Sequence, residues 1–309
     1  MVGSKGTVDV MHVDPASLTV EPESEMRARH STIEWETERR WAQPVFNADF
    51  QLDPQFEPYT PGGGRQERFT DSYADLPIYI TTIEDGVLFG QEFVVCDRLE
   101  PTLSAQRLFL VNLSKITKQI DTLRQLIVPS GPTYLVGACA AHDNFYHWSF
   151  QCLQGVALLR SVAQEQGLDY RIVLPPHDET RQRSLVLLGI DPAECITLPP
   201  DRFLRGVPLM YSLATCSDYT FQPSERLISL LDGYRQAGIE AASPDLPTRF
   251  YLSRRDALKR RSIRTEPELA QDLEARGYPE LTMSELSLED QIGIFARGVY
   301  PSPLTARVW

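Results

Sequence analysis

A histidine at the predicted start of a long helix is the residue of this sequence best suited to proton transfer. His147 stands in the run Asn144-Phe145-Tyr146-His147-Trp148, directly before an amphipathic segment. A neutral imidazole can act as a general base near pH 7, or donate a hydrogen bond to a phosphate or sugar oxygen. A packed histidine bonded to a nearby carbonyl fits the same pattern. The residues alone leave both interpretations open.

Two adjacent arginines, Arg254 and Arg255, follow a short predicted strand. The carboxyl ends of parallel strands are where α/β proteins bind ligands, and guanidinium groups match the oxygens of a diphosphate. The segment 259–264 adds four more basic residues, so a solvated basic loop is an alternative. A nucleic-acid patch is a third interpretation, against which the net charge of −12 and the absence of interleaved aromatic residues argue.

Other catalytic patterns are absent from the sequence. There is no Asp-x-Asp pair of the kind that holds a metal beside a diphosphate, and no Gly-x-Ser-x-Gly nucleophile motif. His142 and His147 are five residues apart, which does not place both on one helical face for a metal. We therefore expect neither a metal nor a cofactor.

The cysteine pattern favours buried, reduced thiols in a cytosolic protein. The number is odd and no two form a Cys-x-x-Cys pair, which argues against a disulfide framework or a zinc site. The five are Cys96, Cys139, Cys152, Cys195 and Cys216. No run of about 18 apolar residues occurs, so the sequence predicts no membrane span.

The elements that must position these residues alternate between strands and helices, which predicts an α/β fold with a mostly parallel sheet. The predicted strands are 133–136, 170–174, 194–198, 206–211 and 249–252. The predicted helices are 148–164, 179–188, 224–236, 265–276 and 287–296. Several of the helices have a capping residue or a terminating glycine at the expected place.

The first third of the chain is less regular. Residues 1–70 are rich in charge, proline and glycine and predict a partly irregular N-terminal arm, with a short helix at 31–41. Asp85-Gly86 is typical of a hairpin turn, and the segment 108–126 is helix-like.

The length of 309 residues fits two domains. A proline-bounded joint at 243–247 is followed by a restart of the strand–helix alternation. This predicts an α/β domain over residues 71–246 and part of a second over residues 247–309.

Two stretches together resemble a known family. One is the run 144–148 after the strand Tyr134-Leu135-Val136-Gly137, and the other is the segment 249–296. In its last helix the matching residues are Leu286, Ser287, Gln291, Phe295 and Ala296, whereas Asp290 replaces the usual glutamate. Over residues 78–296 the chain resembles glycosyltransferase family 61, which includes capsular-polysaccharide biosynthesis proteins.

The resemblance implies a GT-B-like fold of two Rossmann-like domains and an inverting, metal-independent sugar transfer from a nucleotide-sugar to a glycan acceptor, in the cytoplasm. It implies His147 as the catalytic residue. It implies donor-binding roles for Arg254, Arg255, Asn144 and Glu289.

The C-terminus departs from the family pattern. The family continues into an apolar strand and a Gly-Pro-His-Gly-Ala-Gly-Leu-like loop, whereas here residues 298–309 contain Pro301 and Pro303 and no such loop. A central strand cannot contain two such prolines. We therefore expect an incomplete C-terminal domain with an irregular tail and inefficient sugar transfer. The alternative function is a catalytically inactive fragment, or a glycan- or nucleotide-binding module, of the same family.

Overall fold

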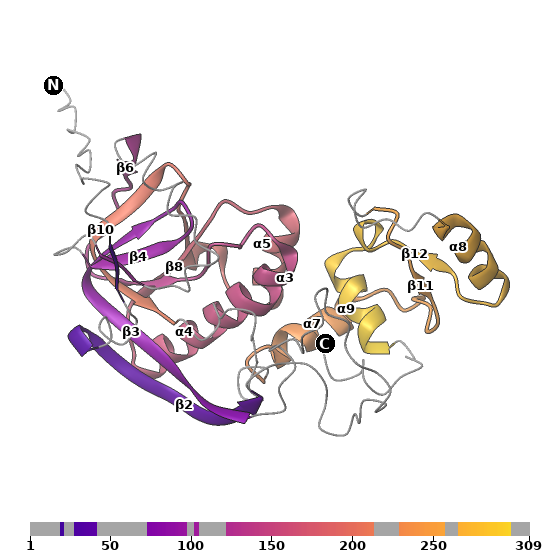
Figure 1. Ribbon diagram of the computed structural model, residues 1–309, viewed down its shortest axis with the longest axis horizontal. Coiled ribbons are helices and arrows are strands. Elements are labelled where there is room, and N and C mark those ends of the chain that lie inside the picture. The colour runs from indigo at the N-terminus through magenta and orange to yellow at the C-terminus, as the bar shows by residue number, and fades with distance from the viewer. Residues whose placement is uncertain are drawn as a thin grey trace, which may run out of the picture. The chain divides into compact units, whose positions relative to one another are not determined.

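The computed structural model describes residues 19–21, 28–41, 73–97, 102–104, 122–212, 229–256 and 265–297. The described chain has an α/β fold with two separate sheets (Figure 1). The strands are β1 Thr19–Glu21, β2 Ser31–Trp41, β3 Tyr73–Phe89, β4 Val94–Asp97, β5 Thr102–Ser104, β6 Arg124–Gln125, β7 Thr133–Val136, β8 Tyr170–Leu174, β9 Cys195–Thr197, β10 Arg202–Tyr211, β11 Tyr251–Leu252 and β12 Glu280–Leu281. The helices are α3 Phe145–His147, α4 Leu153–Glu165, α5 Glu179–Leu187, α7 Asp232–Ala241, α8 Glu266–Ala275 and α9 Leu288–Arg297.

The chain separates into two compact units. The first comprises residues 1–177 and 191–230, and the second comprises residues 178–190 and 231–309. The sequence predicts a boundary between residues 246 and 247, which would place α5 and α7 in the first domain. In the structure both helices belong to the second unit, where α7 packs on α5 and on α9.

The sheet of the first unit is mixed. Its strands follow the order β1-β5-β4-β3-β10-β7-β8-β9, with β2 beside β3 and β6 beside β10. The run β10-β7-β8-β9 is parallel, as the alternation of strands and helices predicts. By contrast β2, β4 and β10 all pair antiparallel with the long strand β3. The predicted strands β7 and β8 are confirmed with the same bounds.

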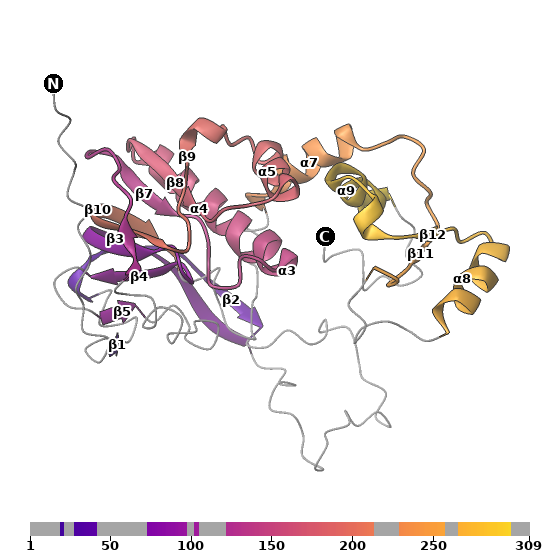
Figure 2. The ribbon, with the colours of Figure 1, turned by 90° about the horizontal axis from the view of Figure 1, so that it is seen from above.

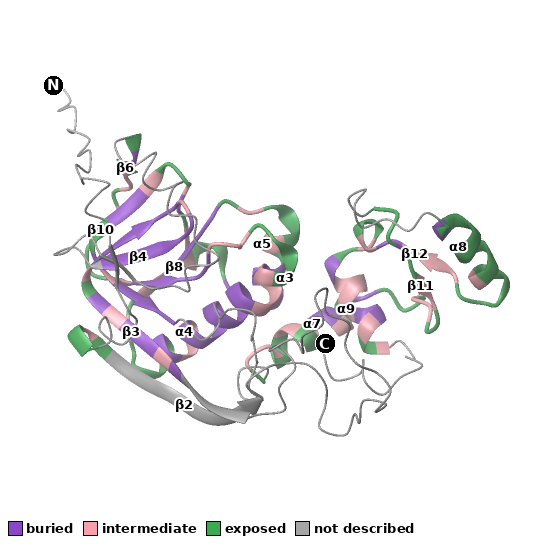
Figure 3. Ribbon diagram, in the orientation of Figure 1, coloured by how far each residue is buried: buried purple, intermediate pink, exposed green. Residues whose placement is uncertain are grey.

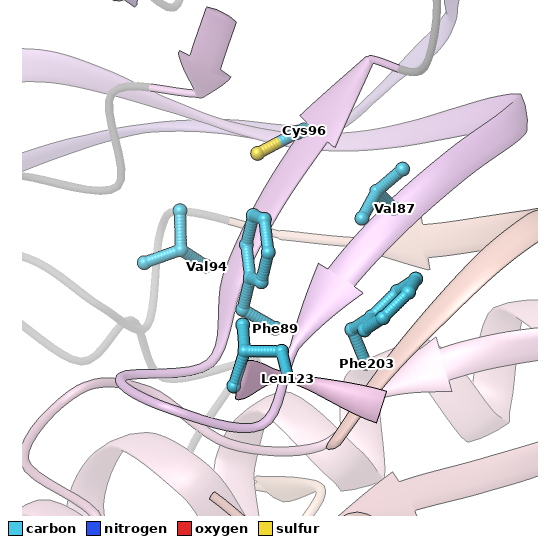
Figure 4. Close-up of a cluster of buried hydrophobic side chains, with 6 residues drawn as sticks. All are labelled: Val87, Phe89, Val94, Cys96, Leu123 and Phe203. Carbon is cyan, nitrogen blue, oxygen red and sulfur yellow. The ribbon is translucent and has the colours of Figure 1, made fainter. Parts of the chain in front are cut away.

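The core of the first unit lies along both parts of this sheet. The central strands are buried over most of their described length (Figure 3). One cluster of buried side chains joins β3, β4 and β10 (Figure 4), and consists of Val87, Phe89, Val94, Cys96, Leu123 and Phe203. Helix α4 packs on β7 and β10 with a nearly continuous buried surface from Leu153 to Leu159.

A glycine at the end of β7 lets this helix and the neighbouring strand approach closely. A Cβ atom at Gly137 would lie 2.7 Å from Leu174 Cδ2 and 2.9 Å from Val156 Cγ2. The backbone N–H of Gly137 donates to the carbonyl of Val173 at 2.9 Å. Gly137 therefore adds one hydrogen bond to the pairing of β7 with β8. It does so where a side chain would have no room.

The segment 31–41 forms strand β2, so its prediction as a helix is wrong. It pairs antiparallel with β3 from Ser31↔Thr82 to Trp41↔Tyr73. The sequence alternates between polar and larger residues over Thr32-Ile33-Glu34-Trp35, which fits a two-residue period once a partner strand is present. Pairing with a distant strand outweighs the weak local signals of a helix cap.

The predicted hairpin turn at Asp85-Gly86 is also wrong, because β3 continues through it, with irregular pairing to β10 on both sides of Gly86. A Cβ atom at Gly86 would lie 2.6 Å from Leu209 Cδ1, so the glycine serves a close strand contact. The chain reverses between β3 and β4 instead. There Glu92 and Phe93 have positive φ angles of 63° and 50°.

Two predicted helices need correction. Helix α7 covers Asp232–Ala241, later than the predicted 224–236, and Gly238 lies inside it instead of ending it. Within the helix-like segment 108–126, the described residues Arg124 and Gln125 form strand β6. Residues 105–121 and 224–228 lie outside the described residues, as do the tail 298–309 and most of the predicted arm.

The second unit contains the small parallel sheet of β11 and β12 and the helices α5, α7, α8 and α9. Helices α8 and α9 confirm the predictions for 265–276 and 287–296 to within one residue. Across the described residues of both units, no helix is long and apolar enough to cross a membrane.

Candidate functional site

The first candidate site lies at the carboxyl ends of two neighbouring parallel strands. Strand β7 leads through the loop 137–144 into α3, and β8 leads into Pro175-Pro176-His177. The rings of Trp148 and His177 stack with centroids 6.2 Å apart, which joins the two segments. Figure 2 shows α3 at one end of the helical stretch that continues into α4. This edge of a parallel sheet is the usual ligand-binding edge of α/β folds.

The imidazole of His147 is held by a buried amide. Its Nδ1 lies 2.7 Å from Oε1 of Gln151, whose side chain is buried. The thiol of Cys139 donates to the same oxygen at 3.5 Å. An amide oxygen only accepts hydrogen bonds, so Nδ1 is the protonated nitrogen and Nε2 keeps its lone pair. His147 is partly exposed, and a lone pair on Nε2 is what a general base requires.

A π-helical segment begins directly after His147 and contains Gln151. Residues Trp148–Cys152 form a π-helix between α3 and α4, and Leu153 N donates to the carbonyl of Trp148. The wider π turn interrupts the regular ladder at the point where His147 and Gln151 meet. Short π segments inside helices are frequent at functional sites.

The Tyr146 ring lies beside His147, and two aromatic side chains at this helix start are exposed. Phe145 is 44% exposed and Tyr146 is 50% exposed, which is unusual for such large side chains. The Tyr146 ring meets His147 edge-on with centroids 5.3 Å apart and lies 5.0 Å from Phe150. Partial burial raises the pKa of the Tyr146 phenol, so the group is a neutral hydroxyl near pH 7. Exposed aromatic faces with a hydroxyl suit a ligand that is both apolar and polar, such as a sugar.

Asn144 caps the helix that carries this group. Its Oδ1 accepts a hydrogen bond from the backbone N–H of Tyr146 at 2.9 Å, as its position before the helix predicts. The observed role of Asn144 is therefore that of a helix cap. A contact between Asn144 and a donor remains a prediction.

The second candidate site follows β11 in the second unit. Arg254 and Arg255 come directly after this strand, as predicted, and both are exposed. The turn is organised by Glu266, the first residue of α8, which is 5% exposed. Its Oε1 accepts from Ser253 Oγ and Tyr251 Oη at 3.1 Å each, and from the backbone N–H of Arg254.

These donors determine the charge state of Glu266. The hydrogen bond from the Arg254 backbone, with those from Tyr251 and Ser253 and the nearby Arg254 charge, lowers the pKa of the Glu266 carboxyl below its usual 4.5. The carboxylate is therefore ionised at neutral pH. It fixes the backbone of Arg254, whose side chain remains at the surface.

The guanidinium of Arg255 pairs with two carboxylates. It lies 3.3 Å from Glu280 and 3.2 Å from Glu285, and about half of the arginine side chain is exposed. A diphosphate at this position would compete with both carboxylates. The donor-binding role of Arg255 therefore stays a prediction that these pairs do not favour.

Glu289 lies in the first turn of α9 and pairs with Arg183 of α5. Its side chain is 12% exposed. Burial, together with the charge of Glu289, raises the pKa of Tyr234 on α7. The observed contacts of Glu289 are therefore with the other helices of the second unit, and a donor contact remains a prediction.

The predicted site residues fall into two groups. His147 and Asn144 lie within one turn in the first unit, whereas Arg254, Arg255 and Glu289 lie in the second. Sequence reasoning missed Gln151, Cys139, His177 and Glu266. The sequence gave a signal for two of them, because His177 follows a predicted strand and Gln151 stands four residues after His147.

No protein-family model, no curated protein and no solved structure matches this chain. Among the described residues, no group of three or more His, Cys, Asp or Glu side chains is arranged to hold a metal ion.

Proposed function

We propose that this chain is a glycosyltransferase with a GT-B-like fold, which moves a sugar from a nucleotide-sugar donor to a glycan acceptor. The observation that carries the proposal is the hydrogen bond from His147 Nδ1 to Gln151. It leaves Nε2 unprotonated on an imidazole that meets the exposed Tyr146 ring, at the sheet edge where α/β folds usually bind ligands. The resemblance to glycosyltransferase family 61 at these residues supports the same conclusion.

The proposed reaction is a single displacement. Nε2 of His147 takes the proton of an acceptor hydroxyl, whose oxygen attacks the anomeric carbon of the donor. The bond to the nucleoside diphosphate breaks, and the diphosphate leaves with the electron pair. Arg254 offers its exposed guanidinium to the diphosphate oxygens, where charge develops. Direct attack inverts the configuration of the anomeric carbon.

Binding is measured by titrating the chain with uridine, guanosine, cytidine and thymidine nucleotides in a calorimeter. We expect one of them to bind, and Arg254→Ala to weaken that binding by about 1.5–3 kcal/mol, the value of a charge-assisted hydrogen bond. Arg205→Ala is the matched control, because Arg205 is exposed on β10 and has no assigned role. Equal binding by the Arg254 variant would remove this residue from the site.

Turnover is measured as nucleoside diphosphate released from the matching nucleotide-sugar, with and without glycan acceptors. His147→Gln is expected to lower the rate by about 10²–10⁴-fold, the usual contribution of a general base, and to leave nucleotide binding unchanged. Tight nucleotide binding without turnover in the unaltered chain would support the alternative of a binding module. Failure to bind any nucleotide would overturn the proposal.

A further inference from the structure

Two buried cysteines lie next to each other behind the His147 group. Cys139 belongs to the loop after β7, and Cys152 is the last residue of the π-helical segment. Their Sγ atoms are 3.8 Å apart, and each side chain is 3% exposed. A disulfide bond needs the sulfurs at about 2 Å. The pair is therefore within about 1.8 Å of bonding distance, a gap that side-chain rotation and a small loop movement can close.

The other cysteines in the described part of the chain lack this arrangement. Cys96 lies on β4 within the hydrophobic cluster of Figure 4. Cys195 follows the residue pair Ala193-Glu194, and burial, followed by the charges of Glu194 and Asp191, raises the pKa of its thiol to about 11. A thiol with so little thiolate at neutral pH reacts slowly with disulfides.

The surroundings of the pair allow access by local opening. Cys139 lies in the irregular loop between β7 and α3. Cys152 lies in the π-helical segment, where the helix departs from regular α geometry. Loops and irregular turns open more readily than the strands of a core. Reaction at a buried thiol then proceeds through such openings, and its rate follows their frequency.

We propose that Cys139 and Cys152 form a reversible thiol–disulfide pair that is oxidised by low-molecular-mass disulfides of the glutathione type. One protein thiolate attacks the small disulfide, and one small thiol leaves. The second protein thiolate then attacks the mixed disulfide and releases the second small thiol. The protein loses two electrons and two protons, and the small disulfide gains them.

Oxidation would change the contacts of the candidate base. The Cys139 thiol donates to Gln151 Oε1, the same atom that accepts from His147 Nδ1. Once Cys139 is in a disulfide it has no proton to donate. Of these two donors, Gln151 Oε1 then keeps the N–H of His147. The redox state of the two cysteines therefore changes the hydrogen bonding of the imidazole.

The test uses the fact that both cysteines fall in one tryptic peptide. Residues 125–160 contain no internal Lys or Arg, and several aromatic residues stand between Cys139 and Cys152. The folded chain is equilibrated in glutathione buffers of graded oxidation, alkylated and digested with trypsin. We expect this peptide to lose the mass of two hydrogens, and its two halves to stay joined after chymotrypsin cleaves between the cysteines. The loss should reverse on reduction.

Three controls make the result decisive. Circular dichroism confirms that the oxidised chain is still folded, and Cys139→Ser and Cys152→Ala should each abolish the two-hydrogen loss. Ring signals of His147 in an NMR spectrum should shift on oxidation of the unaltered chain and not of the variants. A pair that stays fully reduced in the most oxidising buffer, or a disulfide that joins other cysteines, would overturn the proposal. Neither outcome bears on the proposed sugar transfer, which has its own test.

Discussion

His147 and Gln151 form the contact on which the catalytic proposal depends. The distance of 2.7 Å between Nδ1 and Oε1 is that of a good hydrogen bond. His177 provides a comparison within the same unit, because its Nδ1 lies 2.9 Å from the carbonyl oxygen of Pro175. A carbonyl oxygen accepts only, so both histidines should carry their proton on Nδ1.

We predict this tautomer for His147 in the neutral imidazole. Long-range nitrogen–proton NMR spectra should show a protonated Nδ1 and an unprotonated Nε2 for both His147 and His177. Gln151→Met removes the acceptor, and we expect His147 alone to change its tautomer, with a loss of about 1 kcal/mol of unfolding free energy. A protonated Nε2 at His147 in the unaltered chain would contradict the base assignment.

Glu266 accepts three hydrogen bonds at one carboxylate oxygen, from Tyr251, Ser253 and the backbone of Arg254. Its folded-state pKa is lowered, so it stabilises the fold at a pH above its unfolded value of 4.5, and this stabilisation is lost as pH falls through the lower folded value. No pattern in the sequence indicates this role, because the donors lie 12 to 15 residues earlier in the chain.

We predict that Glu266→Gln reduces this pH dependence. Unfolding by urea at pH 7 should show a less stable second unit, and the difference between the variant and the original chain should shrink below pH 4.5. Glu268→Gln is the control, since Glu268 is exposed on the same helix. A difference that stays constant between pH 7 and pH 3 would refute the role given to the ionised carboxylate.

At the scale of elements, glycines decide how α7 and α9 pack. A Cβ atom at Gly238 would lie 2.6 Å from Ile292 Cδ1 of α9. A Cβ atom at Gly293 would collide with the Cβ of Ala242 at the end of α7. The prediction that Gly238 ends a helix is therefore wrong. Glycine also occurs where two helices pack closely, and Gly238 is such a case.

Gly293→Ala should destabilise the second unit by about 1–3 kcal/mol, the usual cost of overpacking. The compensating change Ala242→Gly in the same chain should restore part of the loss. Gly233→Ala is the matched control on α7, where the new Cβ meets nothing within 4 Å, and we expect it to be neutral or slightly stabilising. Chemical denaturation measures all four proteins. Equal stability of the Gly293 and Gly233 variants would show that the helices can move apart freely.

At the scale of the whole molecule, the second unit is built from two separated segments. Helix α5 follows β8 of the first unit along the chain, but it packs on α7 and α9 of the second unit. Leu185 and Leu187 of α5 are buried, whereas Val186 between them is 42% exposed. A cut at residue 247 would therefore remove two helices from the unit to which they belong.

Leu185→Ala should lower the stability of the second unit by about 2–5 kcal/mol, as for other buried leucines. Hydrogen exchange should show faster exchange in α7 and α9, with little change in β7 and β8. Val186→Ala should leave both regions unchanged within about 0.5 kcal/mol. Loss of protection confined to β7 and β8 would assign α5 to the first unit instead.

The sequence by itself determined the parallel core and its helices. The apolar runs of β7 and β8 and the periodic patterns of helices α5, α8 and α9 are local, and local patterns predict local structure. The sequence also placed His147 at a helix start and Arg254 after a strand. Whether these residues act in sugar transfer stays a prediction.

Only the tertiary structure decided the features that depend on distant partners. β2 became a strand because β3 lies beside it, and Gly86 sits inside a strand because Leu209 leaves no room for a side chain. The contact between Cys139 and Gln151 and the donors around Glu266 join residues from separate segments of the chain. Such contacts form only when segments distant in the sequence pack together. The spacing of residues along one element does not predict which segments will do so.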